Sequence, residues 1–282
     1  MTETITYIQN SLKDSYPIQE ISSFIRLIME HVCGLQPHNI LLCKDKDLSD
    51  TEICQIKEIT NRLQQSEPIQ YILGKAFFYG LSFTVNPAVL IPRPETEELI
   101  ELILTKHKND KLHILDIGTG SGCIAISLAK QLNQSEVIGI DISGQALETA
   151  QLNAQQLNAP VTFIQTDILL SHKAEKDISG TFDIIVSNPP YVMDCEKAVM
   201  EQNVLQFEPH QALFVPDNDP LLFYQSIAAF GKKKLKKEGT LYFEINAQCG
   251  NSMIELLTES GYKEVELIRD LSGKDRIIKA IR

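Results

Sequence analysis

Short apolar runs alternate with segments of helical pattern from Lys111 to the end of the chain. Each apolar run has the length of one strand, and each longer segment between two runs can hold a helix. This alternation is typical of a mostly parallel sheet with helices on both faces. The predicted strands are residues 112–117, 137–140, 161–165, 182–187, 241–245, 265–268 and 276–281. Because only a short segment separates the last two strands, we expect them to be antiparallel. The sequence therefore predicts a doubly wound, mostly parallel, seven-stranded α/β sheet.

The N-terminal part of the chain has a helical pattern instead. Apolar residues recur at three- and four-residue spacing over residues 21–28 and 53–63, as expected for amphipathic helices. Pro17, Pro37 and Ser49 stand where helices can begin. We therefore expect a small bundle of about four helices, with the apolar residues as its core.

Two short alternating runs connect the helical part to the sheet. Residues 76–79 and 81–85 are separated by Gly80, which predicts a hairpin. The two prolines of Pro92-Arg93-Pro94 then impose an extended linker, and Pro94 can begin a helix that runs to about Lys106. The predicted domains are a helical bundle at residues 1–74, a hairpin and linker at 75–94, and a sheet domain at 95–282.

The net charge argues against a protein that grips nucleic acid. The chain has 282 residues, with 26 basic against 37 acidic side chains and a formal charge of −11. Such a surface repels polyphosphate. The lysines of residues 232–237 are the one candidate basic patch, and lysines in such a position more often form the solvated end of a helix.

The sequence has no indication of secretion, a membrane span or a metal site. Its six cysteines, at positions 33, 43, 54, 123, 195 and 249, include no Cys-x-x-Cys pair, which fits reduced thiols. No His-Glu-x-x-His spacing occurs. The N-terminus lacks the pattern of a signal peptide, and no apolar run is long enough to cross a membrane. We therefore expect a cytoplasmic protein without a metal.

A glycine-rich loop follows the first predicted strand. Its residues are Asp116, Gly118, Thr119, Gly120, Ser121 and Gly122. Glycines there let the backbone approach a ligand and leave amide groups exposed at the start of a helix. Dinucleotide binders, nucleotide binders and methyltransferases all share such a loop. The spacing differs from the dinucleotide fingerprint Gly-x-Gly-x-x-Gly, because Cys123 follows Gly122 and an acid precedes the loop.

The next two predicted strands also end at acids. Asp141 follows the second strand, where a carboxylate can accept hydrogen bonds from both hydroxyls of a ribose. Asp167, with Ile168 beside it, follows the third strand and could receive the amino group of an adenine. A turn or helix-cap acid explains Asp167 equally well. All these strand ends meet at the sheet edge where ligands bind in doubly wound folds.

The fourth predicted strand, residues 182–187, stops at Asn188-Pro189-Pro190-Tyr191. Neither proline can donate to a sheet, and both stiffen the chain. The asparagine amide and the backbone carbonyls are acceptors suited to holding a planar amino group. Considered alone, an ordinary proline turn explains the stretch equally well.

Together, the glycine loop and the Asn-Pro-Pro-Tyr stretch resemble the class I S-adenosylmethionine-dependent methyltransferases. More narrowly, the chain is similar to the bacterial release-factor glutamine N5-methyltransferase family. The likeness includes residues 68–74, 93–97, 208–213 and 270–276, so it covers nearly the whole chain. It departs from the family pattern in three places: residues 214–219 lack a glycine, Asn246 replaces a glycine, and Ile168 replaces an aromatic residue.

The resemblance implies transfer of a methyl group from S-adenosyl-L-methionine to a side-chain amide, with S-adenosyl-L-homocysteine as the product. The target is the glutamine of the Gly-Gly-Gln loop in peptide chain release factors. The catalytic motif is Asn188-Pro189-Pro190-Tyr191: the Asn188 oxygen and the Pro189 carbonyl accept the amide hydrogens, and Tyr191 packs against the amide plane. No side chain is spaced as an evident general base.

The same resemblance indicates the residues that bind the cofactor and the protein substrate. The cofactor residues are Asp116, Gly118, Thr119, Gly120, Ser121, Gly122, Asp141, Asp167, Ile168 and Asn188. The pocket alone can hardly distinguish one protein glutamine from another, so contacts remote from the chemistry must supply specificity. We therefore expect residues 1–85 to dock the release factor.

Three other functions stay open at this point. Adenine N6-methylation of DNA or RNA uses a similar amino group, but base flipping needs a basic grip on the backbone. A glutamine methyltransferase of a ribosomal protein would share the same motif. A non-enzymatic module that binds an adenosyl ligand or a partner protein fits poorly with two intact motifs.

Overall fold

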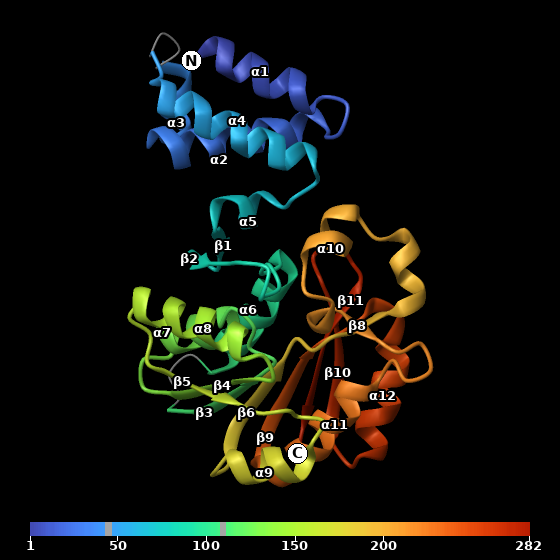
Figure 1. Ribbon diagram of the computed structural model, residues 1–282. Coiled ribbons are helices and arrows are strands. Elements are labelled where there is room, and N and C mark those ends of the chain that lie inside the picture. The colour runs from blue at the N-terminus through green and yellow to red at the C-terminus, as the bar shows by residue number, and fades with distance from the viewer. Residues whose placement is uncertain (43–46, 108–110) are drawn as a thin grey trace. The chain divides into compact units, whose positions relative to one another are not determined.

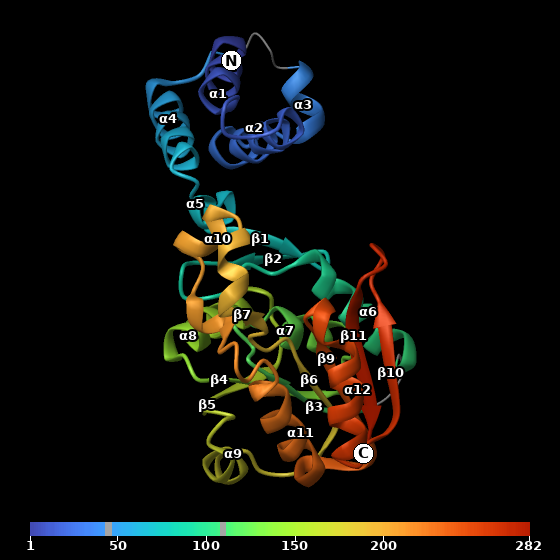
Figure 2. The ribbon, with the colours of Figure 1, turned by 90° about the vertical axis from the view of Figure 1, so that its right-hand side faces the viewer.

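The computed structural model describes residues 1–42, 47–107 and 111–282. The chain forms two compact units, shown in Figures 1 and 2. One unit comprises Met1–Gly74 and Glu201–Phe207, and the other comprises Lys75–Met200 and Glu208–Arg282. The hairpin and linker residues 75–94 therefore lie in the same unit as the sheet. No helix within these described ranges is long and apolar enough to cross a membrane.

The first unit is helical. Its helices are α1 (Thr2–Leu12), α2 (Ile18–Cys33), α3 (Pro37–Leu42), α4 (Asp50–Gln64), α5 (Ile69–Leu73) and α10 (Gln202–Phe207). Pro17 and Ser49 cap α2 and α4, and Pro37 begins α3, which confirms the three predicted starts. Ser49 and Glu52 form a reciprocal capping box at α4, which satisfies backbone groups that the first turn leaves open.

The apolar stripes predicted from the sequence form the core of this helical unit. Ile28 and Ile56 are fully buried, and the other core side chains surround them. The helix α10 clusters with this unit although it lies far along the chain. The periodicity of the N-terminal residues could not predict that contribution, because it depends on a distant segment.

The second unit is built on the predicted seven-stranded sheet. Its order is β10 (Lys263–Arg269), β11 (Asp275–Ile281), β9 (Leu235–Glu244), β6 (Phe182–Ser187), β3 (His113–Ile117), β4 (Glu136–Asp141), β5 (Val161–Gln165). From β9 to β5 every neighbouring pair is parallel. The strand β11 pairs antiparallel with both β10 and β9. The fold class and the antiparallel final pair are thus confirmed.

Helices cover both faces of the sheet (Figure 1). The helices α6 (Pro94–His107), α7 (Cys123–Gln131) and α8 (Gly144–Gln156) share one buried cluster, and α9 (Ser171–Asp177), α11 (Leu222–Lys234) and α12 (Gly250–Glu259) lie against the other face. Within β3, Ile114 belongs to the first cluster and Leu115 to the second. Successive strand residues point to opposite faces, so both faces of this strand are buried.

One strand begins earlier than the apolar run predicted. The strand β9 starts at Leu235 rather than at residue 241. The sequence did not predict this start, because Lys236, Lys237 and Glu238 interrupt the apolar run. Its register with β6 shifts between Phe182 and Ile184. The early start is therefore a consequence of pairing with β6 rather than of local sequence.

Two of the lysines of residues 232–237 are paired with acids. Lys233 pairs with Glu175 at 2.6 Å, and Lys236 pairs with Asp183 at 2.7 Å. Pairing with acids neutralises charge that a nucleic-acid backbone would need. The predicted alternative, a lysine-rich helix end, holds for Lys232, Lys233 and Lys234 in the last turn of α11, whereas Lys236 and Lys237 belong to β9.

Among the cysteines, Cys54, Cys123, Cys195 and Cys249 are free thiols, as the sequence predicts. Cys43 lies outside the described residues.

A two-stranded hairpin, β1 (Lys75–Phe78) with β2 (Leu81–Thr84), attaches to the sheet unit through Asn153 of α8. The buried Asn153 Oδ1 accepts from the Thr84 amide at 2.7 Å. Its Nδ2 donates to the carbonyls of Thr84 at 3.0 Å and Ser121 at 2.9 Å. One side chain therefore joins the hairpin, α8 and the glycine loop.

We predict that Asn153→Ala destabilises this unit by on the order of 3 kcal/mol. The change removes the partner of the buried Ser121 carbonyl and of the part-buried amide and carbonyl of Thr84, and a buried group left without a partner costs about 1–3 kcal/mol. Urea unfolding measures the loss. The matched control is Gln156→Ala, which removes an exposed contact to the Thr84 hydroxyl and should change stability by less than about 0.5 kcal/mol. Equal losses in the two variants would contradict the prediction.

Candidate active site

A pocket of about 330 Å³ lies at the carboxyl ends of β3, β4, β5 and β6. The strand β3 has β4 on one side and β6 on the other, so the winding of the chain reverses here. Doubly wound sheets bind ligands at such a switch point. The predicted site residues that line the pocket are Gly118, Gly120, Asp141, Asp167, Ile168, Asn188, Pro189 and Pro190.

The glycines of the loop after β3 serve two different purposes. Gly118 and Gly120 have φ angles of +74° and +54°, and no atom lies within 4 Å of an added Cβ. A side chain at either position would strain the backbone, and both residues border the pocket. At Gly122 an added Cβ would lie 2.9 Å from Ile126 Cδ1. Two glycines therefore expose backbone to the pocket, and the third lets α7 pack closely.

Asp116 holds this loop from behind rather than lining the pocket. It is fully buried, and its Oδ2 accepts from the Thr119 hydroxyl at 2.6 Å and the Ala125 amide at 3.2 Å. Burial raises its pKa to about 7, against the effect of these hydrogen bonds. Among the described residues its Oδ1 has no hydrogen-bond partner.

Three further residues of the glycine loop also lie outside the pocket lining. Thr119 and Ser121 are buried, and Gly122 caps α7. Direct contact of these residues and of Asp116 with a cofactor stays a prediction. The contacts that they make in the structure shape the loop.

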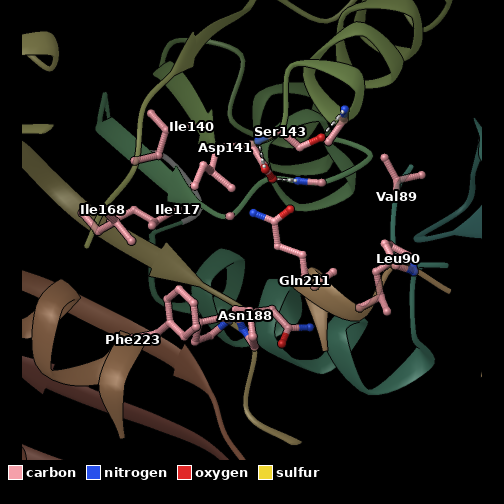
Figure 3. Close-up of a pocket in the computed structure, with 18 of the residues that line it drawn as sticks. Val89, Leu90, Ile117, Ile140, Asp141, Ser143, Ile168, Asn188, Gln211 and Phe223 are labelled. Atoms are coloured by element: carbon pink, nitrogen blue, oxygen red, sulfur yellow. Dashed lines mark hydrogen bonds between the residues drawn. The ribbon is translucent and has the colours of Figure 1, made fainter. Parts of the chain in front are cut away.

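Asp141 lines the pocket with its carboxylate held by the backbone. Its Oδ2 accepts from the Gly120 amide and its Oδ1 from the Ser143 amide, each at 2.9 Å (Figure 3). Burial raises its pKa. A carboxylate offers about four lone-pair positions, so Asp141 can still accept from two ligand hydroxyls.

Asp167 and Ile168 line the pocket beside Asp141. Asp167 Oδ1 accepts from the Leu169 amide at 2.9 Å, which is the turn function that the sequence also allowed. Ile168 is buried and contributes an apolar wall. This wall suits the flat apolar face of a base, while the second carboxylate oxygen of Asp167 leaves an acceptor nearby.

Asn188, Pro189 and Pro190 line the opposite part of the pocket, but Tyr191 does not. Asn188 Nδ2 donates to the Thr96 hydroxyl oxygen at 3.3 Å. The Tyr191 hydroxyl donates to Glu244 Oε1 at 3.1 Å, and burial raises its pKa. The structure therefore brings Tyr191 together with Glu244, and its packing on a substrate amide stays a prediction.

Glu244 is the main residue of the site that the sequence analysis missed. It is buried at the end of β9, where its Oε2 accepts from the Thr96 hydroxyl at 2.6 Å. Burial raises its pKa. The available signal was a single acid inside the apolar run 241–245, since a charge in a buried strand needs a specific partner.

Glu208 joins two stretches that the family resemblance had singled out separately. It is buried, and its carboxylate pairs with Arg93 at 2.6 Å and accepts from the Ile91 amide at 3.2 Å. Residues 93–97 and 208–213 are thus held against each other. This contact attaches the start of α6 to the segment before η2 (His210–Ala212).

Two departures from the family pattern lie beside Tyr191. Asn246 Nδ2 donates to the Tyr191 carbonyl at 3.1 Å and to Glu196 Oε2 at 3.0 Å. The short strand β8 (Phe214–Val215) pairs with β7 (Val192–Met193). Both stretches therefore contact the segment after the Asn-Pro-Pro-Tyr stretch in this chain.

The remaining walls come from residues to which the sequence analysis gave no role in the site, although Gln211 lies in the stretch 208–213 that carries the resemblance. Val89 and Leu90 follow the hairpin, Gln211 lies in η2, and Phe223 lies in α11. Figure 3 shows these side chains around the pocket, with Gln211 pointing into it. They meet only because the chain folds around the sheet edge.

Two family models match the chain. Residues 108–269 match a methyltransferase domain, and residues 3–74 match a PrmC N-terminal domain. The chain is 48% identical to a release factor glutamine methyltransferase of Bacteroides thetaiotaomicron over 100% of both chains. It is 45% identical to the protein of that name from Flavobacterium psychrophilum, over 97% of this chain and 96% of the relative.

Solved structures share the fold at low identity. A methyltransferase from Pyrococcus furiosus has a TM-score of 0.55 and 17% identity, covering 80% of this chain and 98% of its own. A 16S rRNA methyltransferase from T. thermophilus, solved with AdoMet and guanosine, has a TM-score of 0.53 and 17% identity, covering 74% and 49%. These structures confirm the predicted class I methyltransferase fold.

The raised pKa of Asp116 predicts a pH dependence of stability. The pKa is about 7 in the folded protein and about 3.9 in an unfolded chain. The folded state therefore holds this proton more tightly, and the stabilisation is lost as pH rises from about 4 to 7. Asp116→Asn cannot ionise and keeps an acceptor for Thr119. We expect its melting temperature, relative to the unsubstituted protein, to rise between about pH 5 and pH 7 and to level off above that range in thermal scans. A difference that does not change with pH would contradict the assignment.

Proposed function

This chain belongs to the family of release factor glutamine methyltransferases, and we propose that it methylates the glutamine of the Gly-Gly-Gln loop in peptide chain release factors. The methyl donor is S-adenosylmethionine, and the reaction takes place in the cytoplasm. The observation that supports the proposal most directly is one pocket lined by Asp141 at one strand end and by Asn188 and Pro189 at another. Asp141 suits the hydroxyls of an adenosyl group, and Asn188 and Pro189 suit the hydrogens of an amide.

The pocket residues fit S-adenosylmethionine by their chemistry. Asp141 retains acceptor positions for ribose hydroxyls, and the side-chain-free backbone of Gly118 and Gly120 borders the pocket. Ile168 and Asp167 would receive the adenine. When bound, the cofactor supplies a methyl group already activated on a sulfonium. The T. thermophilus neighbour, solved with AdoMet, supports the same choice of donor.

The protein's task is to orient a poor nucleophile. The lone pair of an amide nitrogen is delocalised into its carbonyl, so the nitrogen attacks weakly. Asn188 Oδ1 and the Pro189 carbonyl accept its two hydrogens, which aims the nitrogen and stabilises the positive charge that develops on it. With S-adenosylmethionine bound, the nitrogen–carbon bond would form as the sulfur–carbon bond breaks, S-adenosylhomocysteine would be released, and the nitrogen would give its proton to solvent.

The alternatives have less support. The printed name of the relatives specifies a release factor and a glutamine, which favours this substrate over a ribosomal-protein glutamine. Adenine methylation needs a basic surface for the nucleic acid, whereas lysines 233 and 236 are paired with acids. The formal charge of −11 also argues against a nucleic-acid substrate.

We predict that Asn188→Ala lowers turnover by roughly tenfold to a hundredfold, because one acceptor for the substrate amide is lost. Its affinity for S-adenosylmethionine, measured by calorimetry, should stay near normal.

Asp141→Ala should do the reverse, weakening cofactor binding with a smaller loss of rate at saturating cofactor. The assay follows labelled methyl transfer to a release factor and to an oligonucleotide. Near-normal transfer by Asn188→Ala, or transfer only to the oligonucleotide, would overturn the proposal.

The helical N-terminal region is proposed to dock the release factor, as residues 1–85 were predicted to do. The structure suggests a sharper test, because residues 75–84 belong to the sheet unit. A truncated protein beginning at Lys75 should keep its affinity for S-adenosylmethionine yet methylate the release factor at least about tenfold more slowly, since remote contacts align the reacting group. Circular dichroism checks whether the truncated protein is folded. A folded truncated protein with the full rate would show that docking lies elsewhere.

A further inference from the structure

An asparagine side chain can be turned either way with almost no change in shape, but only its oxygen accepts hydrogen bonds. If the proposed function holds, Asn188 must present Oδ1 to the substrate amide. The opposite orientation would point N–H groups at the N–H groups of the substrate. Something must therefore hold the Asn188 amide before the substrate arrives.

The Thr96 hydroxyl determines which end of Asn188 faces it. Thr96 Oγ1 lies 2.6 Å from Glu244 Oε2 and 3.3 Å from Asn188 Nδ2. Thr96 donates its single hydrogen to Glu244 Oε2, which accepts it. Toward Asn188, Thr96 can then only accept. Nδ2 of Asn188 must face Thr96, and Oδ1 is left for the pocket.

Glu244 is itself held in place. Its Oε1 accepts from the Tyr191 hydroxyl at 3.1 Å, and its backbone carbonyl accepts from the Tyr224 hydroxyl at 3.1 Å. Burial raises the pKa of Glu244, and the hydrogen bonds from Thr96 and Tyr191 and the nearby charge of Arg276 act against that rise. A buried carboxylate with these partners is an acceptor of fixed position.

Thr96 is anchored from the other side. It is the third residue of α6 and is buried, and its amide donates to the Arg93 carbonyl at 3.1 Å. Arg93 pairs with the buried Glu208. A displacement of the start of α6 would break the ion pair between Arg93 and Glu208.

We propose that Thr96 and Glu244 are positioning residues that orient the Asn188 amide, with its oxygen presented to the substrate glutamine. They do not touch the reacting atoms. They set the direction of one chain of hydrogen bonds, from Asn188 through Thr96 to Glu244, so the site is ready before the substrate binds.

The first test compares three threonine variants in the full-length protein. Thr96→Val keeps the shape of the side chain but removes the acceptor for Asn188, so kcat should fall by about tenfold or more. Thr96→Ser keeps the hydroxyl and should retain most of the rate. Thr240→Val, at a buried threonine elsewhere on β9, is the matched control and should behave like the unsubstituted protein. Affinity for S-adenosylmethionine and KM for the release factor should change by less than about twofold in all three.

The second test reverses the chain of hydrogen bonds without changing its shape. In Glu244→Gln the new amide can donate to Thr96, whose hydrogen is then free to donate to Asn188 Oδ1. The Asn188 oxygen would turn away from the substrate, so kcat should fall about tenfold or more while the fold and cofactor affinity persist. This variant decides the matter if Thr96→Val proves unstable.

The outcomes separate this inference from the proposed function. If the unsubstituted protein does not methylate a release factor, the proposed function fails. If it does, a normal kcat in both Thr96→Val and Glu244→Gln overturns the inference alone. Loss of activity in Thr96→Ser equal to that in Thr96→Val would also overturn it, because Thr96 would then act through packing rather than through its hydroxyl.

Discussion

Parallel pairing of β3 with β4 on one side and β6 on the other is the constraint on which the site depends. Parallel strands in register end at the same edge of a sheet. Ile117 pairs with Ile140 of β4 and with Ser187 of β6. The residues that follow these three positions are therefore neighbours, and they are the glycine loop, Asp141 and Asn188. The Ser187 hydroxyl donates to the Ile117 carbonyl at 2.6 Å, which joins two of the strand ends directly.

Three buried carboxylates hold the walls of the pocket, and none of them lines it. Asp116 holds the glycine loop, Glu208 holds the linker before α6, and Glu244 holds Tyr191 and Thr96. Burying a carboxylate is costly unless it is hydrogen-bonded or paired. Each of these three carboxylates is hydrogen-bonded or paired. If the loop or linker that it holds moved away, the buried acid would lose its partners. Such carboxylates favour one arrangement of the loops over nearby alternatives.

The departures from the family pattern fit this account of the site. Asn246, in place of a glycine, adds a donor to the Tyr191 carbonyl. The segment without glycine forms β8 and pairs with β7. Both stretches contact the backbone just after the motif, and Asn188 and Pro189 line the pocket.

Local sequence determined the elements of this protein and the strand ends that carry polar residues. Apolar periodicity, glycines and prolines act within a few residues, so the seven strands, the helix starts at Pro17 and Ser49, and the acid at Asp141 were predictable. Only the tertiary structure decided the start of β9, the partner of Glu208 and the connection from Asn188 through Thr96 to Glu244. Those partners lie 115, 92 and 148 residues apart. A polar side chain shows in the sequence that it needs a partner, but which partner it receives depends on how the sheet brings distant segments together.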